Sequence, residues 1–458
     1  MRKTTILAAL FVTLALVAAL WLSSTLPGVA NAQEPEQEVE VPFLEEWMGS
    51  GHNDAEAEAF THWDEDDPAV VGVACAKCHS TPGYLDFLGA DGSEAGVVDA
   101  DAPIGTTVEC VACHNNVTIH KDSVVMPSGL EITGLGGEAR CMECHQGRHS
   151  TISVTEAISS AGVTDDDTVS EDLGFSNIHY YPAAATKYGT LAKGGFEYDG
   201  KTYDGNFVHV EGFDTCIGCH SPHTLELKVE ACGDCHTGVT DVEGLKDVRM
   251  AGSLVDYDGD GDMGEGAYYE LEGLKDVRMA GSLVDYDGDG DMGEGAYYEL
   301  EGLKEILYQA IQGYAAEVAG TPIMYDSGSY PYWFTEDEEG YNAWTARLAK
   351  AAYNYQMATK DPGAYAHGGK YITQLLYDSI EDLDPALVEG LQRIDHGHFA
   401  GSEEAFRHWD EDGEVPASCS KCHSAGGLPT FLKDGATVSE PLPNGFQCAT
   451  CHDDVSTF

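Results

Sequence analysis

Every cysteine of this chain belongs to a Cys-x-x-Cys-His unit, and that pattern constrains the fold more than any other feature of the sequence. The 458 residues contain 14 cysteines, and seven such units use all of them. The paired thiols are Cys75 and Cys78, Cys110 and Cys113, Cys141 and Cys144, Cys216 and Cys219, Cys232 and Cys235, Cys419 and Cys422, and Cys448 and Cys451. The histidines that follow them are His79, His114, His145, His220, His236, His423 and His452.

The spacing of these units has a chemical reason. Residues i and i+3 lie on the same side of one helical turn, so both thiols can form thioethers to one haem. The next residue, a histidine, then lies under the iron as its proximal ligand. A disulfide framework needs no histidine after each pair, and structural zinc needs two such pairs or distant histidines. The sequence therefore predicts seven covalently attached c-type haems.

Each haem iron has a second axial position that another histidine can fill. The chain has 18 histidines, so those outside the units outnumber the seven irons. Two histidines per iron leave no vacancy, which suits electron transfer and not substrate binding. The predicted distal ligands are His52, His62, His179, His209, His223, His367, His398 and His408. His120 is a further candidate, and His149 and His396 each lie close to another histidine that could serve instead.

An internal repeat groups some of these ligands with their haems. The segment from Gly51 to Trp63 recurs from Gly397 to Trp409, and two Cys-x-x-Cys-His units follow each copy. The repeat indicates a duplicated haem module. The first copy continues to a third unit, whereas the second stops at Phe458, so the sequence is expected to be an incomplete gene product. A natural stop after the seventh unit is the alternative.

The charge of the chain limits its partners. Its 79 acidic and 23 basic residues give a net charge of −56, which repels nucleic acids and anionic membrane surfaces. Residues 1–32 have a basic start, an apolar run and a small-residue site before Gln33, which is typical of a secretory signal peptide. A membrane becomes a partner only if this segment stays uncleaved. We therefore expect a secreted protein, periplasmic or extracellular.

A second repeat has a different character. Residues 243–271 and 272–300 are identical over 29 residues, through a recent duplication or an assembly error. Each copy contains Asp-Tyr-Asp-Gly-Asp-Gly-Asp, which favours a tight loop around calcium, although Ala267 replaces the glutamate that closes an EF-hand. The closing ligand is then Glu265 or Glu270, and a solvated acidic turn is the alternative. The predicted ligands are Asp256, Asp258, Asp260, Asp262 and Glu265, and in the second copy Asp285, Asp287, Asp289, Asp291 and Glu294.

The remaining pattern is helical. Apolar residues recur at helical spacing over Leu303–Val318, Ala343–Thr359 and Tyr371–Ile380, and few segments alternate as strands do. The expected fold is mainly α with much irregular chain, a multihaem cytochrome c architecture in which haems form much of the core. The predicted divisions are 1–32 (signal peptide), 33–150 (three-haem module), 151–242 (two-haem module), 243–302 (acidic repeat), 303–396 (helical segment) and 397–458 (truncated two-haem repeat).

The central part of the chain resembles a known family. Asn177-Ile-His-Tyr-Tyr-Pro-Ala-Ala-Ala-Thr186 leads to Gly212-Phe-Asp-Thr-Cys216 and Cys219-His-Ser-Pro-His223. This arrangement is similar to that of secreted multihaem (polyhaem) c-type cytochromes of environmental bacteria. The resemblance implies electron transfer through closely packed haems outside the cytoplasm. It also implies redox partner proteins or extracellular electron acceptors, and self-association is compatible with it.

An enzyme is the alternative interpretation. A multihaem reductase or other oxidoreductase would act on a small nitrogen or sulfur compound at one open haem. Some such enzymes carry lysine in place of the histidine of one unit, and none of the seven units here does. The sequence therefore favours an electron-transfer protein over a catalyst, and it leaves the question of enzymatic activity open.

Overall fold

The structure, a computed structural model, describes residues 41–210, 212–236, 238–250, 284–393, 404–410, 412–442 and 450. The chain divides into two compact units, residues 1–45 and 46–458, and every contact given below lies within the second. Several predicted features lie outside the described residues: the signal peptide, the first acidic loop from Asp256 to Glu270, His396, His398, and Cys448, Cys451 and His452.

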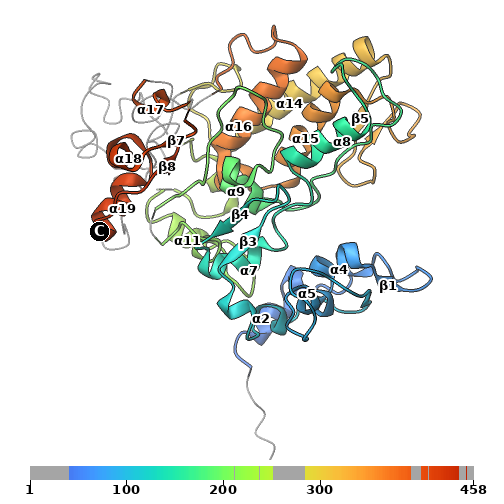
Figure 1. Cartoon of the computed structure of the whole chain (residues 1–458), viewed down its shortest axis with the longest axis vertical. Helices are drawn as coiled ribbons and strands as arrows, with labels where there is room; N and C mark the ends of the chain where they lie inside the picture. Colours follow the sequence, from blue (N-terminus) through green and yellow to red (C-terminus); the bar gives the residue numbers. More distant parts are fainter. Residues whose placement is uncertain are drawn as a thin grey trace, which may run out of the picture. The chain divides into compact units, whose positions relative to one another are not determined.

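The described chain is mainly helical with long irregular connections, which confirms the predicted fold class (Figure 1). The three longest helices are α14 (Ala296–Tyr314), α15 (Ala346–Lys360) and α16 (Ala364–Leu383), and the π-helix η5 (Ala315–Ala319) continues α14. The other α-helices are α2 (Leu44–Met48), α3 (Glu58–Thr61), α4 (Val73–His79), α5 (Thr81–Phe87), α6 (Cys110–Cys113), α7 (Ala139–Met142), α8 (Thr151–Ser160), α9 (Ala183–Ala192), α10 (Cys216–Cys219), α11 (Val229–Cys232), α12 (Val242–Lys246), α17 (Glu404–Arg407), α18 (Ala417–His423) and α19 (Gly427–Asp434). Short 3-10 turns are η1 (Gly51–Asn53), η2 (Thr118–His120) and η3 (Gly136–Glu138).

The described strands are short and antiparallel, and they pair two by two. The pairs are β1 (Val70–Val71) with β2 (Ala102–Pro103), β3 (Ser123–Val125) with β4 (Glu131–Thr133), β5 (Met324–Tyr325) with β6 (Trp333–Phe334), and β7 (Glu414–Val415) with β8 (Glu440–Pro441). In β3 and β4, Val124 lies opposite Ile132. Sheets this small cannot form a core of their own, so they serve to fix loops between helices.

The described parts of the two repeat copies share a helix cap and a close helix contact. Ser80 caps α5 by accepting a hydrogen bond from the backbone N–H of Gly83, and Ser424 accepts one from Gly427 at the start of α19. A Cβ atom on Gly83 would lie 2.4 Å from a backbone oxygen of α4, and one on Gly427 would lie 2.2 Å from the equivalent oxygen of α18. Glycine is therefore required where these helices cross.

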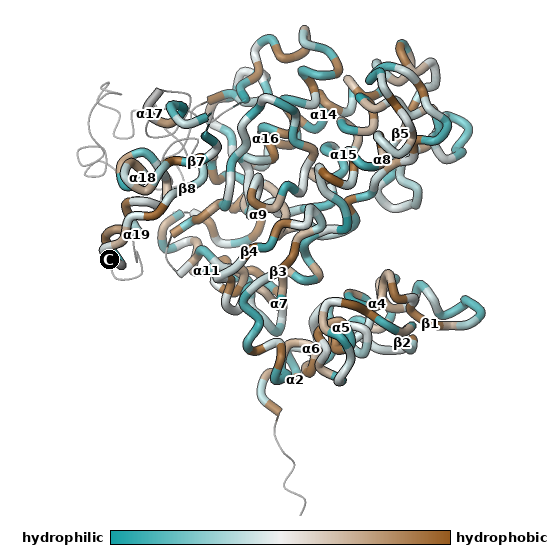
Figure 2. Tube along the Cα trace, viewed as in Figure 1, coloured by the Kyte–Doolittle hydropathy of each residue, from teal (hydrophilic) through white to brown (hydrophobic). Residues whose placement is uncertain are grey.

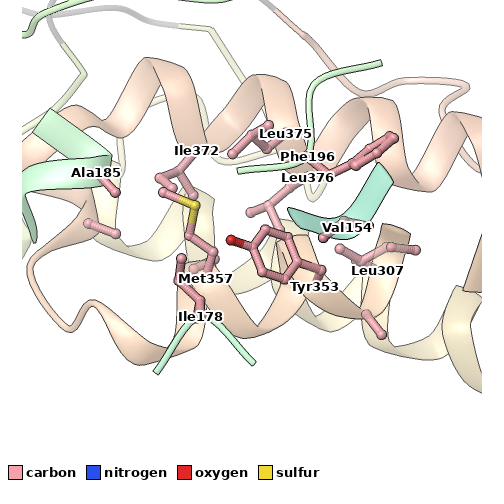
Figure 3. Close-up of a cluster of buried hydrophobic side chains, with 14 of the residues drawn as sticks. Val154, Ile178, Ala185, Phe196, Leu307, Tyr353, Met357, Ile372, Leu375 and Leu376 are labelled. Carbon is pink, nitrogen blue, oxygen red and sulfur yellow. The ribbon is translucent and has the colours of Figure 1, made fainter. Parts of the chain in front are cut away.

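The largest hydrophobic cluster is built by α14, α15 and α16 together with the central part of the chain (Figure 3). Tyr353 and Met357 of α15 pack with residues of α16, and the Tyr353 hydroxyl donates to the carbonyl oxygen of Gly194 at 2.7 Å. Asn354, also on α15, accepts from the N–H of Phe196 and donates to its carbonyl oxygen. These hydrogen bonds therefore attach α15, which contains no Cys-x-x-Cys-His unit, to the part of the chain that contains such units.

The segment from Val71 to Ala112 has two much smaller clusters of buried apolar side chains. One comprises Val71, Ala76 and Ala102, and the other comprises Tyr84, Leu88 and Ala112. Hydrophobic and hydrophilic residues are interspersed along the chain (Figure 2). Within the described ranges, no helix has both the length and the apolar character needed to cross a bilayer.

Candidate haem sites

The helices at the Cys-x-x-Cys-His units differ in extent. The first and sixth units lie wholly within α4 and α18, and the second and fourth supply the single turns α6 and α10. The helices α7 and α11 end within the third and fifth units. In α6 and α10 the two cysteines are the first and last helical residues. The backbone N–H of the following histidine donates to the carbonyl oxygen of the first cysteine, at 2.9 Å for His114 and 2.8 Å for His220. Each turn therefore holds two thiols and one imidazole close together. The twelve cysteines of the described chain form no disulfide.

Five of these histidines face a second histidine from another segment of the chain. The ring pairs and their centroid distances are His79 with His179 (5.8 Å), His114 with His223 (6.1 Å), His145 with His52 (6.4 Å), His220 with His367 (6.4 Å) and His236 with His209 (5.9 Å). Every partner in these pairs is a predicted distal ligand. The sequence identified the candidates but did not assign them to individual haems.

The separation of the paired rings suits a shared iron. A metal–imidazole bond is about 2 Å long, and each ring centre lies roughly 1 Å beyond its nitrogen. Two such ligands on opposite sides of one metal ion therefore place the ring centres about 6 Å apart. The planes vary from nearly parallel in His114 and His223, at 8°, to nearly perpendicular in His79 and His179, at 76°. The residues present thus fit bis-histidine haem.

Hydrogen bonds at Nδ1 orient several of the paired rings. The Nδ1 atoms of His79, His145 and His220 lie 2.8, 3.3 and 3.1 Å from the backbone carbonyl oxygens of Ala59, Tyr181 and Leu225. A ring that donates from Nδ1 to a carbonyl leaves Nε2 unprotonated and available to a metal ion.

The surroundings of three of the partner rings favour their neutral form. Burial, with a smaller contribution from the facing histidine, lowers the pKa of His52, His179 and His209 to about 4. Because a cationic imidazole cannot ligate iron, a lowered pKa favours the ligating form at neutral pH.

The loop from Asn177 to Tyr181 contributes contacts to two of the histidine pairs. His179 and Tyr181 both have left-handed backbone angles, with φ of 75° and 53°. This conformation is strained for residues other than glycine, and such strain clusters at functional sites. The side chain of Asn177 accepts the N–H of His179 at 2.8 Å and so stabilises the turn. The loop thereby places the His179 ring against His79 and the Tyr181 carbonyl against His145.

A glycine lets this loop pack closely on the third unit. Gly147 has a φ of 78°, and a Cβ atom there would lie 2.9 Å from Cδ1 of Ile178. The next residue, Arg148, donates its backbone N–H to the carbonyl oxygen of Ile178 at 2.9 Å. The Gln-Gly-Arg sequence after His145 therefore positions the loop that carries His179.

His367 comes from the helical segment, which contains no Cys-x-x-Cys-His unit. It lies in the first turn of α16, and its Nδ1 is 2.9 and 3.0 Å from the two carboxylate oxygens of Asp361. A Cβ atom on Gly363 would lie 2.6 Å from the imidazole ring, so glycine leaves room for it. Burial alone would lower the pKa of His367, but the carboxylate of Asp361 raises it overall. Sequence patterns gave no signal for the role of Asp361.

Four other candidates lie elsewhere. Nδ1 of His62 lies 3.8 Å from a carboxylate oxygen of Glu58. Both His62 and His408 also lie against a tryptophan. Each contacts the tryptophan that follows it, at 5.0 Å in both copies. His120 is exposed at the end of η2, and Nδ1 of His149 lies 2.6 Å from the carbonyl oxygen of Asn177.

The tryptophans of the repeat are site residues that sequence reasoning missed. Trp63 lies 5.3 Å from His79 at 59°, and Trp409 lies 5.3 Å from His423 at 62°. The equal geometry in both copies indicates that the aromatic ring holds the histidine of the unit from one side. The invariant His-Trp pair in the repeat was the signal available.

Three of the units lie next to one another. Glu143, within the third unit, forms ion pairs of 2.7 Å with Lys77 of the first unit and with Lys121. The thiol of Cys78 is in hydrogen-bond contact with that of Cys144, and the thiol of Cys141 with that of Cys216. The first, third and fourth units therefore adjoin in space although they are not consecutive in sequence.

The second acidic loop gathers its carboxylates into two overlapping groups. Oxygen atoms of Asp285, Asp287 and Asp289 lie within 4.8 Å of one another, as do those of Asp287, Glu294 and Glu299. Asp291 belongs to neither group. Glu299 is buried and accepts the backbone N–H groups of Tyr286 and Asp287 at 2.8 and 3.2 Å. It occupies the place in this copy that Glu270 has in the first.

The charges of this loop repel one another. Burial, followed by the neighbouring carboxylate of Asp287, raises the pKa of Glu294 to about 7. Burial likewise raises the pKa of Glu299 to about 8. One carboxylate oxygen of Glu294 is buried without a hydrogen-bond partner. The loop is thus an all-oxygen site of the type that hard cations prefer.

Comparison with known proteins supports a haem-binding assignment. The chain is similar to the C-type polyheme cytochrome OmcC of Geobacter sulfurreducens, with 25% identity over 405 residues. The chain is a distant homologue of a polyhaem c-type cytochrome. The match covers 74% of this chain but 46% of that protein, so the chain spans less than half the length of its relative. No protein-family profile and no solved structure matches the chain.

Proposed function

We propose that this protein transfers electrons through a series of covalently attached c-type haems, each of the first five held between two histidines. The five ring pairs carry this proposal, because each joins the histidine of a Cys-x-x-Cys-His unit to a second imidazole at the spacing of two axial ligands. When bound, haem supplies a reversible one-electron couple.

The side chains around the units support this role in three ways. The helical turns hold two thiols for the thioether bonds, and the paired rings fill both axial positions. The partial burial of His52, His179 and His209 limits the access of water to the ligands. The contacts between the first, third and fourth units support a close approach of their haems, which electron transfer between haems requires.

The count of seven haems follows from the seven units, of which six are described in whole. Secretion follows from residues 1–32, because covalent haem attachment and an oxidising compartment both suit an exported chain. We expect electron donors and acceptors to be redox partner proteins or extracellular acceptors.

Electron paramagnetic resonance of the oxidised, haem-loaded protein tests the proposal, together with its intact mass. Low-spin ferric signals and a mass increase equal to seven haems are expected. A substantial high-spin signal that responds to nitrite or cyanide would instead support the reductase, with one open axial position. A mass increase of five or fewer haems would refute the count.

We also propose that the second acidic loop binds calcium through the groups formed by Asp285, Asp287 and Asp289 and by Asp287, Glu294 and Glu299. Two of these carboxylates, Asp287 and Glu299, are buried, and a divalent cation would offset their mutual repulsion. Titration calorimetry of the chelator-treated protein with CaCl₂ should show saturable binding. The absence of heat, with no change in melting temperature, would leave a solvated acidic turn.

A further inference from the structure

The contact between Asp361 and His367 differs in kind from the Nδ1 contacts of three other paired histidines. Those histidines, His79, His145 and His220, contact neutral backbone carbonyl oxygens. His367 instead contacts both oxygens of a carboxylate, at 2.9 and 3.0 Å. At the fourth unit, Nδ1 of His220 therefore contacts a neutral acceptor, whereas Nδ1 of His367 contacts a charged one.

The structure preserves the negative charge of Asp361. The side chain is 1% exposed, and its Oδ1 accepts the backbone N–H of Gly363 at 3.1 Å. The hydroxyl of Thr186 also hydrogen-bonds the carboxylate. Asp361 immediately follows α15 and His367 lies in the first turn of α16, so the helix pair fixes their separation. A charged hydrogen bond that is shielded from water is stronger than one at the surface.

A carboxylate behind a ligating imidazole changes the chemistry of the metal. It fixes the tautomer, with the proton on Nδ1 and Nε2 free to ligate, and it raises the basicity of the ring. A more basic ligand donates more electron density and stabilises ferric over ferrous iron. Hydrogen bonding to axial ligands is one of the means by which proteins adjust haem potentials.

We propose that Asp361 lowers the reduction potential of the haem held by Cys216, Cys219, His220 and His367. The inference rests on the proposed bis-histidine ligation of that haem. It assigns to the helical segment, which carries no haem of its own, control over the ease with which the fourth haem accepts an electron.

The substitution Asp361→Asn tests this directly, because it keeps an oxygen acceptor for Nδ1 and removes the charge. Spectroelectrochemical titration of the haem-loaded protein should show one component moving to higher potential. The expected change is tenfold or more in the one-electron reduction equilibrium, where tenfold equals about 59 mV. Unchanged potentials with all iron still low-spin would overturn the inference. So would conversion of one haem to high spin, because Asp361 would then only hold the ring in place.

A second variant, expected to shift the reduction potential in the opposite direction, distinguishes this effect from a folding defect. Thr186→Val removes one hydrogen bond from the carboxylate and makes it more basic, so the same component should move to lower potential. A shift upward would contradict the proposal. Asp378→Asn is the matched control: Asp378 is another buried carboxylate, paired with Arg393 and hydrogen-bonded by Tyr203, and its loss should leave this component in place.

Failure of the ligation itself is recognised separately. In His367→Ala, one haem should become high-spin and so identify the spectrum of the fourth haem. If all iron stays low-spin in that variant, the pairing of His220 with His367 is wrong. That result would refute the proposed ligand set, independently of any effect of Asp361.

Discussion

Nζ of Lys77 lies 2.7 Å from Oε2 of Glu143, and each residue stands between the two cysteines of its own Cys-x-x-Cys-His unit. The carboxylate of Glu143 also pairs with Lys121 at 2.7 Å, and its side chain is only 3% exposed. A buried carboxylate between two partly exposed lysines therefore joins the first unit to the third. Residues that are free to vary in the haem-attachment pattern are used here to fix the arrangement of the haems.

The variant Glu143→Gln should destabilise this junction. It removes the charge that two lysines satisfy, and hydrogen bonds to charged groups contribute about 1.5–3 kcal/mol each to stability. We expect a loss of about 1–3 kcal/mol in the free energy of unfolding, measured by urea denaturation. Glu131→Gln, at an exposed position of β4, is the control and should behave as the wild type. Equal stability of the two variants would show that the ion pairs contribute nothing.

Replacement of a single distal histidine should change a single haem. In His52→Ala the iron of the third unit loses the ring that faces His145, so one haem per chain should become high-spin in the oxidised protein. His120→Ala removes an exposed histidine and should leave the spectrum low-spin. Identical spectra for the two variants would contradict the assignment of His52.

The close packing at Gly147 should be intolerant of a side chain. In Gly147→Ala the left-handed backbone costs about 1–2 kcal/mol, and the added Cβ meets Ile178 as well. Gly162→Ala has the same type of backbone angle, with φ of 67°, and no atom within 4 Å of the new Cβ. The first variant should therefore lose more stability than the second in urea denaturation, and only the first should weaken ligation by His179.

The acidic loop should make stability depend on pH when calcium is absent. The folded-state pKa values of Glu294 and Glu299, about 7 and about 8, lie above the ordinary value of 4.5. Between pH 4.5 and 8 the folded state therefore holds protons that the unfolded state has released, so stability falls as the pH rises. Melting temperatures of the chelator-treated protein should show this decline, and saturating calcium should remove it.

The variant Glu299→Gln is the control for that dependence. It removes the carboxylate with the higher pKa and should flatten the decline in the chelated protein. A decline that persists unchanged in this variant would place its source elsewhere in the chain.

The sequence predicts which residues could hold haem but not which distant histidines meet in the fold. The helical turns at the units follow from their spacing, and the predicted distal candidates include all five histidines found in ring pairs. Which histidine meets which unit depends on the packing of distant segments, and no periodicity encodes that. The repeat groups His52 with the first two units, yet its ring faces His145 of the third unit.

Sequence patterns also did not predict the first residue of α14 or the role of Asp361. The predicted helix from Leu303 begins earlier, at Ala296, because the end of the acidic repeat continues the same helical face. The buried side chain of Asp361 reads in sequence as an ordinary polar residue between helices. Its role depends on the turn that returns α16 alongside α15, a tertiary feature.

The wide sequence separation within the histidine pairs has a consequence for how the protein assembles. In the proposed bis-histidine arrangement, a haem can be attached as soon as its own two cysteines and histidine are exposed, but its second ligand arrives only when another segment docks. The second ligand of the first unit arrives with the loop of His179, and that of the fourth unit arrives with α16. Each docking closes a large loop of chain. The iron then cross-links the two segments, and this ligation is detected as a change of spin state. The cofactors thus serve as internal reporters, and the order in which haems become low-spin during refolding would record the order in which the distant segments join.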